Sequence, residues 1–117
     1  MKSDSSPKPS IAFSDFQKLD LRVGKVIDAT NIVQSRKLIE LTVDLGEEHG
    51  VQTVFTGMRT WYTPQDYIGK QFLFVVNLEP KKMMGKECGS MMLAADEDGT
   101  PLLLEISSTI PLGLPVW

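Results

Sequence analysis

The residues able to act as acids, bases or nucleophiles are few and scattered along the 117-residue sequence. The single histidine, His49, stands in an acidic loop beside Glu47 and Glu48. The single cysteine, Cys88, has no histidine or aspartate near it in the sequence. A metal site or a nucleophile with its base needs several such groups together. We therefore predict no catalytic set, no metal site and no cofactor.

Basic side chains gather in a few places and point to a different chemistry. They lie in two predicted loops and after one predicted strand: Arg36 and Lys37, then Lys81, Lys82 and Lys86, and Arg59. Such groups neutralise phosphates, which supplies the electrostatic part of nucleic-acid affinity. The formal net charge is -3, so nucleic-acid binding would need a local basic patch. The alternative is that these are ordinary solvated loop charges.

Aromatic side chains supply the other half of single-strand RNA recognition, because unstacked bases pack on them. The candidates are Phe55, Trp61 and Tyr62. We expect all three to cover the core rather than to stack on bases. The methionines are predicted to fill gaps in the core, and an exposed apolar partner surface is the alternative: Met83, Met84, Met91 and Met92.

The first part of the chain predicts a short helix followed by three strands. Ser14 to Gln17 has the S-x-x-Q capping pattern, with Phe16 and Leu19 on the buried face of that helix. Residues 21–31 change to strand periodicity, with Leu21, Val23 and Ile27 inward and a bulge or bend at Gly24. Strict alternation then predicts a strand over residues 37–45, and residues 51–56 form the returning strand. The inward residues of the strand over residues 37–45 are Ile39, Leu41, Val43 and Leu45.

The second part predicts another short helix and further strands. Thr63 and Pro64 cap the start of this helix, and Gly69 ends it. Residues 71–77 form a strand buried on both sides, and residues 78–90 form a long polar loop. Residues 91–95 and 101–106 are two more strands, joined by a turn at Glu97-Asp98-Gly99.

This order predicts a mainly β protein: an OB-fold, a five-stranded Greek-key barrel with one short helix before strand 1 and another between strands 3 and 4. Residues 1–10 are polar and rich in proline and serine, and we expect a disordered tail or linker there. Residues 11–117 form the domain with a C-terminal extension. OB-folds bind oligonucleotides through strands 2 and 3 and the loops after strands 1 and 4, where the basic residues lie.

Five sequence segments resemble one known family. They are DFQKLDLRVGKV from Asp15, VDLG from Val43, YIGK from Tyr67, NLEPKKMMGKE from Asn77 and MMLAAD from Met91. The chain resembles, from about Ser14 to about Pro111, the tRNA-binding domain at the C-terminus of methionyl-tRNA synthetases. That domain also occurs in free-standing dimeric tRNA-binding proteins and in relatives of endothelial-monocyte-activating polypeptide.

The resemblance implies a non-catalytic module that binds tRNA and assists aminoacylation, with tRNA, a second copy of the chain and an aminoacyl-tRNA synthetase as partners. The RNA-binding residues expected from the basic loops and the family pattern are Arg36, Lys37, Arg59, Asn77, Lys81, Lys82, Lys86, Cys88 and Ser90. Cys88 and Ser90 replace the family's usual serine and glycine, and the loop from Ile32 to Arg36 also departs from its pattern. The alternative is the related export-chaperone branch, which holds unfolded chains as a dimer.

The remaining expectations concern location and assembly. One cysteine, no apolar stretch long enough to span a bilayer and no apolar signal region predict a cytoplasmic protein. Whether the chain is free-standing or a domain of a synthetase stays open. The apolar side chains of the segment from Ile110 to Trp117 would form an aggregation-prone patch if they stayed exposed to water. Either a second copy covers them in a homodimer, or the segment folds back and buries Trp117 on its own barrel.

Overall fold

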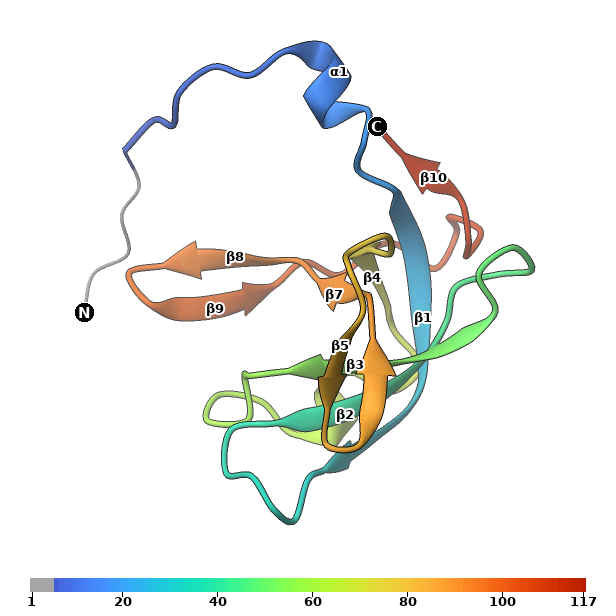
Figure 1. The fold of residues 1–117 in the computed structure, drawn as a ribbon. Coiled ribbons are helices and arrows are strands. Elements are labelled where there is room, and N and C mark those ends of the chain that lie inside the picture. Colours follow the sequence, from blue (N-terminus) through green and yellow to red (C-terminus); the bar gives the residue numbers. More distant parts are fainter. Residues whose placement is uncertain (1–5) are drawn as a thin grey trace.

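The computed structural model describes residues 6–117 and shows the predicted OB-fold (Figure 1). The main sheet is antiparallel, with strand order β3-β2-β1-β4-β7. Its strands are β1 (Leu21–Asn31), β2 (Ile39–Asp44), β3 (Val51–Thr56), β4 (Gln71–Val75) and β7 (Met91–Met92). The two ends of this path, β3 and β7, contact each other, and the Ser90 hydroxyl donates a hydrogen bond to Oε1 of Gln52 at 2.8 Å. The sheet therefore closes into a barrel.

Alternation along β2 builds the centre of the barrel, as predicted. Ile39, Leu41, Val43 and Leu45 are fully buried, together with Tyr67, Phe72 and Phe74. Gly24 lets β1 cross this core closely. A Cβ atom there would lie 2.7 Å from Cδ2 of Leu45 and 2.8 Å from Cδ1 of Phe74, so a larger residue would force the core apart.

The predicted inward position of Ile27 is wrong. Its neighbour Val26 is fully buried, whereas Ile27 is 48% exposed. The register of β1 against β2 shifts between Val26 and Asp28. Gly24 and Val26 share the inner face of this part of β1, so Ile27 lies on the opposite face by plain alternation. The register shift that follows is a bulge, one extra residue in the strand. The bulge lies here rather than at Gly24.

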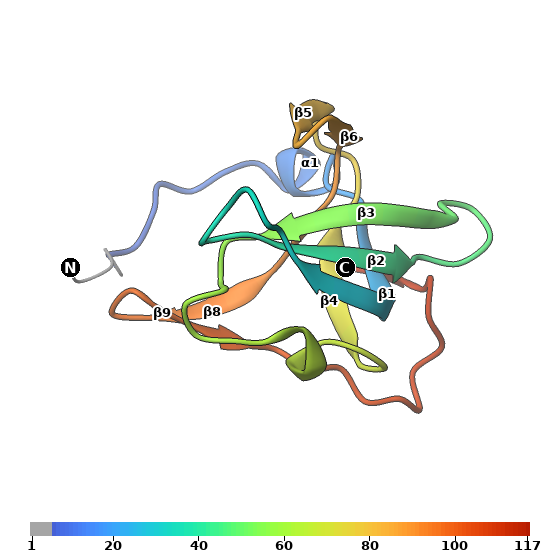
Figure 2. The same ribbon diagram turned by 90° about the horizontal axis from the view of Figure 1, so that it is seen from below.

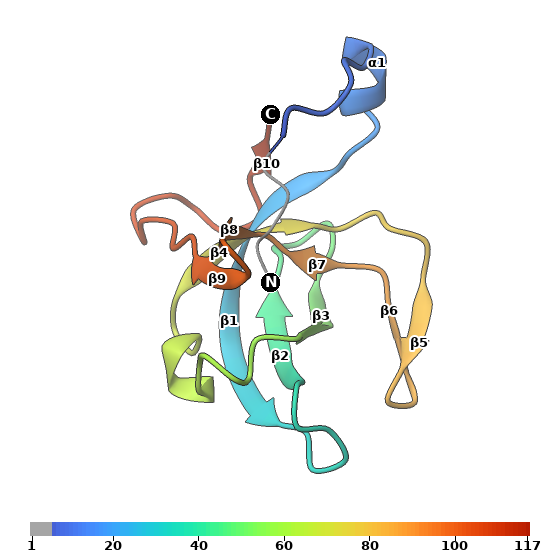
Figure 3. The same cartoon turned by 90° about the vertical axis from the view of Figure 1, so that its left-hand side faces the viewer.

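Both predicted helices form, but only the second begins as expected. The helix between β3 and β4 is one 3-10 turn, η1 (Pro64–Asp66), with Thr63 as N-cap; Oδ2 of Asp66 accepts from the Thr63 amide at 2.8 Å. Helix α1 (Phe13–Phe16) begins after Ala12, with no side-chain cap bond, so the predicted capping box at Ser14 is wrong. The predicted buried face is also wrong, because α1 stands off the barrel (Figure 3) and Leu19 is exposed.

A hairpin replaces the predicted polar loop at residues 78–90. It consists of β5 (Lys81–Met83) and β6 (Lys86–Cys88). Its turn residues, Met84 and Gly85, both have positive φ angles, 48° and 78°. Two such residues at the centre of a two-residue turn match the twist of the flanking strands. A polar segment thereby becomes an ordered projection.

A second hairpin, β8 (Ala94–Glu97) and β9 (Thr100–Leu103), turns at Asp98 and Gly99 as predicted. These strands form a separate two-stranded sheet beside the barrel (Figure 2). The predicted strands over residues 91–95 and 101–106 are therefore not both barrel strands. Only Met91–Met92 joins the main sheet, and Ile106 returns to it through a single bridge with Gln71.

The C-terminal segment folds back onto its own barrel. Strand β10 (Pro115–Val116) pairs with the start of β1, with Val116 opposite Leu21, and the Gly113 amide donates to the Val23 carbonyl at 2.7 Å. Trp117 is nevertheless 96% exposed. The expectation that the folded-back segment buries Trp117 on its own barrel is therefore wrong.

The predicted tail over residues 1–10 lies in part outside the described residues. Residues 6–10 carry no helix or strand and are exposed. Within residues 6–117, no helix is long and apolar enough to cross a membrane.

Candidate nucleic-acid interface

The chain's own basic hairpin packs against the outer face of β3 and reaches β2 through one ion pair. On that face Glu40 lies opposite Phe55 in the antiparallel register, and β6 of the hairpin contacts β3. Nζ of Lys86 is 2.7 Å from Oε2 of Glu40, and the Cys88 thiol donates to the Thr53 carbonyl at 3.4 Å. Phe55 is only 8% exposed as a result. The hairpin thus occupies part of the face that other OB-folds offer to oligonucleotides, and the hairpin itself is the basic surface.

The three lysines of the hairpin differ in their surroundings. Lys81 and Lys82 are exposed, and neither makes an ion pair or a side-chain hydrogen bond within residues 6–117. Lys86 is partly neutralised by Glu40. The uncompensated positive charge of the hairpin therefore lies at Lys81 and Lys82.

The β1–β2 loop presents the other pair of basic residues and is held in shape by Arg59. Arg36 and Lys37 are exposed in this loop. The Arg59 guanidinium donates to the carbonyls of Ile32, at 2.9 Å, and Ser35, and its amide donates to the Lys37 carbonyl at 3.2 Å. Arg59 acts as a clamp on the loop, although its sequence position suggested a phosphate contact. The loop and the tip of the hairpin project toward the same end of the barrel (Figures 1 and 3).

The three polar residues predicted to contact RNA are tied into the fold. Oδ1 of Asn77 accepts from the Asp20 amide at 2.8 Å, and its Nδ2 donates to the Lys18 carbonyl at 2.6 Å. Ser90 is buried against Gln52, and the Cys88 thiol is close to the carbonyls of Thr53 and Ser90. Their partners are mostly distant in sequence, so no local signal reveals these roles.

The predicted aromatic and methionine positions are confirmed in part. Tyr62 covers the core as expected, with its hydroxyl donating to the Pro101 carbonyl at 2.8 Å. Phe55 is buried as expected, but Trp61 is 47% exposed and lines a hollow of about 340 Å³ beside the β8–β9 hairpin. Met92 fills the core, whereas Met84 and Met91 are exposed.

His49 belongs to a charged cluster that joins three distant segments. Nε of Arg22 donates to Oδ1 of Asp20 at 2.7 Å, Nε2 of His49 lies 3.1 Å from Oδ2 of Asp20, and the Arg22 guanidinium donates to the Gly113 carbonyl at 3.2 Å. The hydrogen bond from Arg22, aided by its charge and by His49, keeps the pKa of Asp20 below its usual value. The same bond raises the pKa of Arg22. In the described part of the chain, no group of three or more His, Cys, Asp or Glu residues could hold a metal ion.

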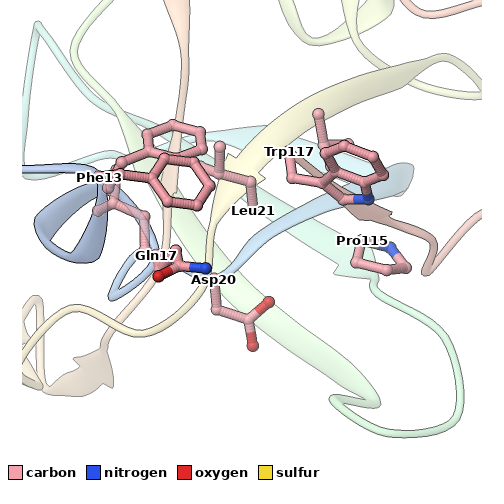
Figure 4. A pocket seen from close by; sticks show the side chains of 9 residues that line it. Phe13, Gln17, Asp20, Leu21, Pro115 and Trp117 are labelled. Atoms are coloured by element: carbon pink, nitrogen blue, oxygen red, sulfur yellow. The ribbon is translucent and has the colours of Figure 1, made fainter.

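An apolar hollow of about 370 Å³ lies between α1 and β10. Figure 4 shows the ring of Phe13 on one side of it, Trp117 on the other and Leu21 between them. Phe13 is 71% exposed and Trp117 96%. Residues near both ends of the described chain thus contribute exposed apolar surface to this one hollow.

Comparisons with known proteins show which family the chain resembles over most of its length. Residues 21–115 match the model of the family described as "Putative tRNA binding domain". Among curated proteins, the chain is 42% identical over 106 residues to a methionine–tRNA ligase from Methanothrix thermoacetophila, covering 91% of this chain and 15% of that protein. It is 39% identical over 109 residues to the ligase from Archaeoglobus fulgidus, covering 93% of this chain and 16% of that protein. The chain thus spans only a small part of these relatives.

Two solved structures cover nearly the whole chain. The crystal structure of a MetRS-related protein from Pyrococcus horikoshii has a TM-score of 0.87 and 37% identity, covering 94% of this chain and 100% of that one. The crystal structure of the chaperone CsaA from Bacillus anthracis has a TM-score of 0.80 and 32% identity, covering 93% and 100%.

Proposed function

Because the chain belongs to the tRNA-binding domain family, which its residues 21–115 match, we propose that it binds tRNA through the β5–β6 hairpin and the β1–β2 loop. The observation that carries this proposal is the exposed, uncompensated charge of Lys81 and Lys82 on an ordered projection. Phosphates would take the place of solvent around these ammonium groups. Such contacts position an RNA without reading its sequence.

The other predicted site residues support the interface in different ways. Arg36 and Lys37 would meet phosphates from the β1–β2 loop, with Arg59 holding that loop in place. Lys86 would join them when it leaves Glu40. Asn77, Cys88 and Ser90 would act by fixing the root of the hairpin. Few phosphates can be neutralised, so we expect micromolar affinity with a modest dependence on salt.

We further propose that the chain is not itself an enzyme and assists aminoacylation by holding tRNA for a synthetase. It matches a small part of methionine–tRNA ligases and the whole of the MetRS-related protein, so either a synthetase domain or a separate subunit fits. A reducing cytoplasm suits its single free cysteine, Cys88.

Titration of the full chain with bulk tRNA at about 50 mM and about 200 mM salt tests the proposal. The parent should bind more weakly at the higher salt. Lys81→Glu with Lys82→Glu should weaken binding to every tRNA alike and lower the slope of log affinity against log salt by about 2. The control, Lys25→Glu with Lys70→Glu, makes the same change in net charge on other elements, β1 and the turn before β4. Equal binding by the parent and the hairpin double variant would contradict the site.

A chaperone is the second candidate function, favoured by the likeness to CsaA and by the exposed apolar hollow at Phe13 and Trp117. A reduced and carboxymethylated protein serves as an unfolded probe. Binding of this probe, unaffected by competing tRNA and by the hairpin variant, would favour the chaperone over the tRNA-binding module.

We also propose that a second copy of the chain covers the hollow between α1 and β10. Exposed apolar side chains of this size are costly in water, and a two-fold interface would bury the same patch on both subunits. Two basic hairpins on one particle would also raise the effective concentration for a large RNA.

A further inference from the structure

A third hollow lies under the basic hairpin, on the side that faces the barrel. It has a volume of about 290 Å³. Its walls come from β3, from the segment before β5, from the hairpin and from the start of β7. Four apolar side chains line it, Phe55, Leu78, Met83 and Met91, with Lys81 and Glu79 at the same site.

We propose that this hollow receives one unpaired base of the bound RNA, an inference that rests on the proposed tRNA binding. Small-molecule sites usually span roughly 300 to 1,000 Å³, so this volume suits a single heterocycle. The flat apolar faces of a base match the walls, and the methionine thioethers make favourable contacts with aromatic rings. Folded RNA is commonly recognised through bases that leave the stack.

The positive charges of Lys81 and Lys82 favour a base over an apolar protein side chain as the occupant. Lys81 lines the hollow and Lys82 follows it, and neither ammonium is paired within the described residues 6–117. A nucleotide carries a phosphate on each side of its base, so it would place anions beside these lysines while the base fills the apolar space. An apolar side chain would leave both ammonium groups in water and gain nothing from them.

The polar groups around the hollow do not favour one base over another. The Ser90 hydroxyl already donates to Gln52, and the Cys88 thiol already faces two carbonyls. Stacking without a fixed set of hydrogen bonds tolerates every base, so the ligand class is RNA with an unstacked nucleotide of any identity.

The test compares two RNA hairpins that differ at one bulged nucleotide. One carries a base there, and the other has an abasic sugar with the same phosphates. The full chain should bind the first about five-fold more tightly or better. Met83→Ala and Met91→Ala should each bring this ratio toward one and leave the affinity for the abasic RNA unchanged. Met84→Ala is the matched control, because this exposed methionine of the same hairpin does not line the hollow.

Because the ratio is measured within each protein, a loss of stability in a variant lowers both affinities and not their quotient. Equal binding of the two RNAs by the parent would overturn the base site while tRNA binding stands. Failure of the parent to bind bulk tRNA would overturn the proposed function itself. An apolar peptide bound in a manner sensitive to Met83→Ala and Met91→Ala, with a base ratio of one, would also overturn the inference and assign the hollow to protein side chains.

Discussion

Nζ of Lys86 on β6 lies 2.7 Å from Oε2 of Glu40 on β2, and this ion pair ties the basic hairpin to the barrel. Both side chains are partly accessible to water, and pairs of this kind contribute up to about 1 kcal/mol. Within the proposed function, Glu40 competes with an RNA phosphate for Lys86. The same carboxylate that ties the hairpin to the barrel would therefore lower the affinity for RNA.

Replacing Glu40 with glutamine should strengthen tRNA binding up to about five-fold, since Lys86 then becomes free. Filter binding or anisotropy at low salt measures the change. Glu87→Gln removes one negative charge from the hairpin itself, at an exposed residue with no ion pair within the described part of the chain. It should change affinity less. Equal strengthening by the two variants would mean that general charge, and not the release of Lys86, is the cause.

Replacing Arg59 with methionine should loosen the β1–β2 loop, because its guanidinium bonds to the Ile32 and Ser35 carbonyls are lost. A carbonyl left without its partner costs about 1 to 3 kcal/mol. Amide hydrogen exchange should become faster at residues 35–38, and tRNA affinity should fall.

A double-mutant cycle separates this clamp from a direct phosphate contact. If Arg59 acts only by holding Arg36 and Lys37 in position, it has no effect once both are replaced by methionine. Arg59→Met in that background should therefore change tRNA affinity little further. A full additional loss in that background would show that Arg59 contacts the RNA itself.

Stability should depend on pH through Asp20. Its pKa in the folded protein is lowered from 3.8 by Arg22, so the stabilisation is present above 3.8 and is lost as the pH falls through the folded-state value. Asp20→Asn should therefore unfold at lower urea concentration than the parent at pH 7, and the two midpoints should converge in acid. Glu48→Gln is the control, because Glu48 is exposed and lies 4.0 Å from Arg22. A gap between Asp20→Asn and the parent that persists unchanged in acid would contradict this reason.

Replacing Trp117 with alanine should weaken the proposed homodimer, since its exposed ring borders the hollow between α1 and β10. Sedimentation velocity at tens of micromolar gives the mass of the parent and the variant. Val33→Ser, which removes an equally exposed apolar side chain from the β1–β2 loop, should leave the dimer intact. A monomeric parent would rule the dimer out.

The barrel could be predicted because its signals are local. The alternation that ends at Leu45 buries one face of β2 wherever its neighbours lie, and the cap at Thr63 and Pro64 marks η1 by its own chemistry. Ile27 was misplaced because Val23 and Val26 are both buried, on opposite faces of β1. Val23 lies beside the C-terminal segment and Val26 lies in the core, a difference that residues 21–31 alone do not encode. The helix at Phe13 was given a buried face by its spacing, yet Leu19 of that face is exposed.

The site was predicted less completely, since charge type is visible in a sequence but charge partners are not. Lys81, Lys82 and Lys86 have the same side chain, and only the fold brings Glu40 to one of them. Arg59 has the composition of a phosphate ligand but contacts backbone carbonyls of the neighbouring loop. The order of the hairpin depends on a positive φ at Met84, a conformation for which methionine carries no signal.

The pairing of Leu21 with Val116 joins residues near the two ends of the described chain. Contacts between such distant positions close a very large loop and form slowly. In refolding, β10 should therefore dock after the barrel strands have assembled, as a late kinetic phase. Until then, the edge of β1 at Leu21 offers free backbone groups beside apolar side chains, which favours pairing with another chain. The yield of refolding should accordingly fall as protein concentration rises.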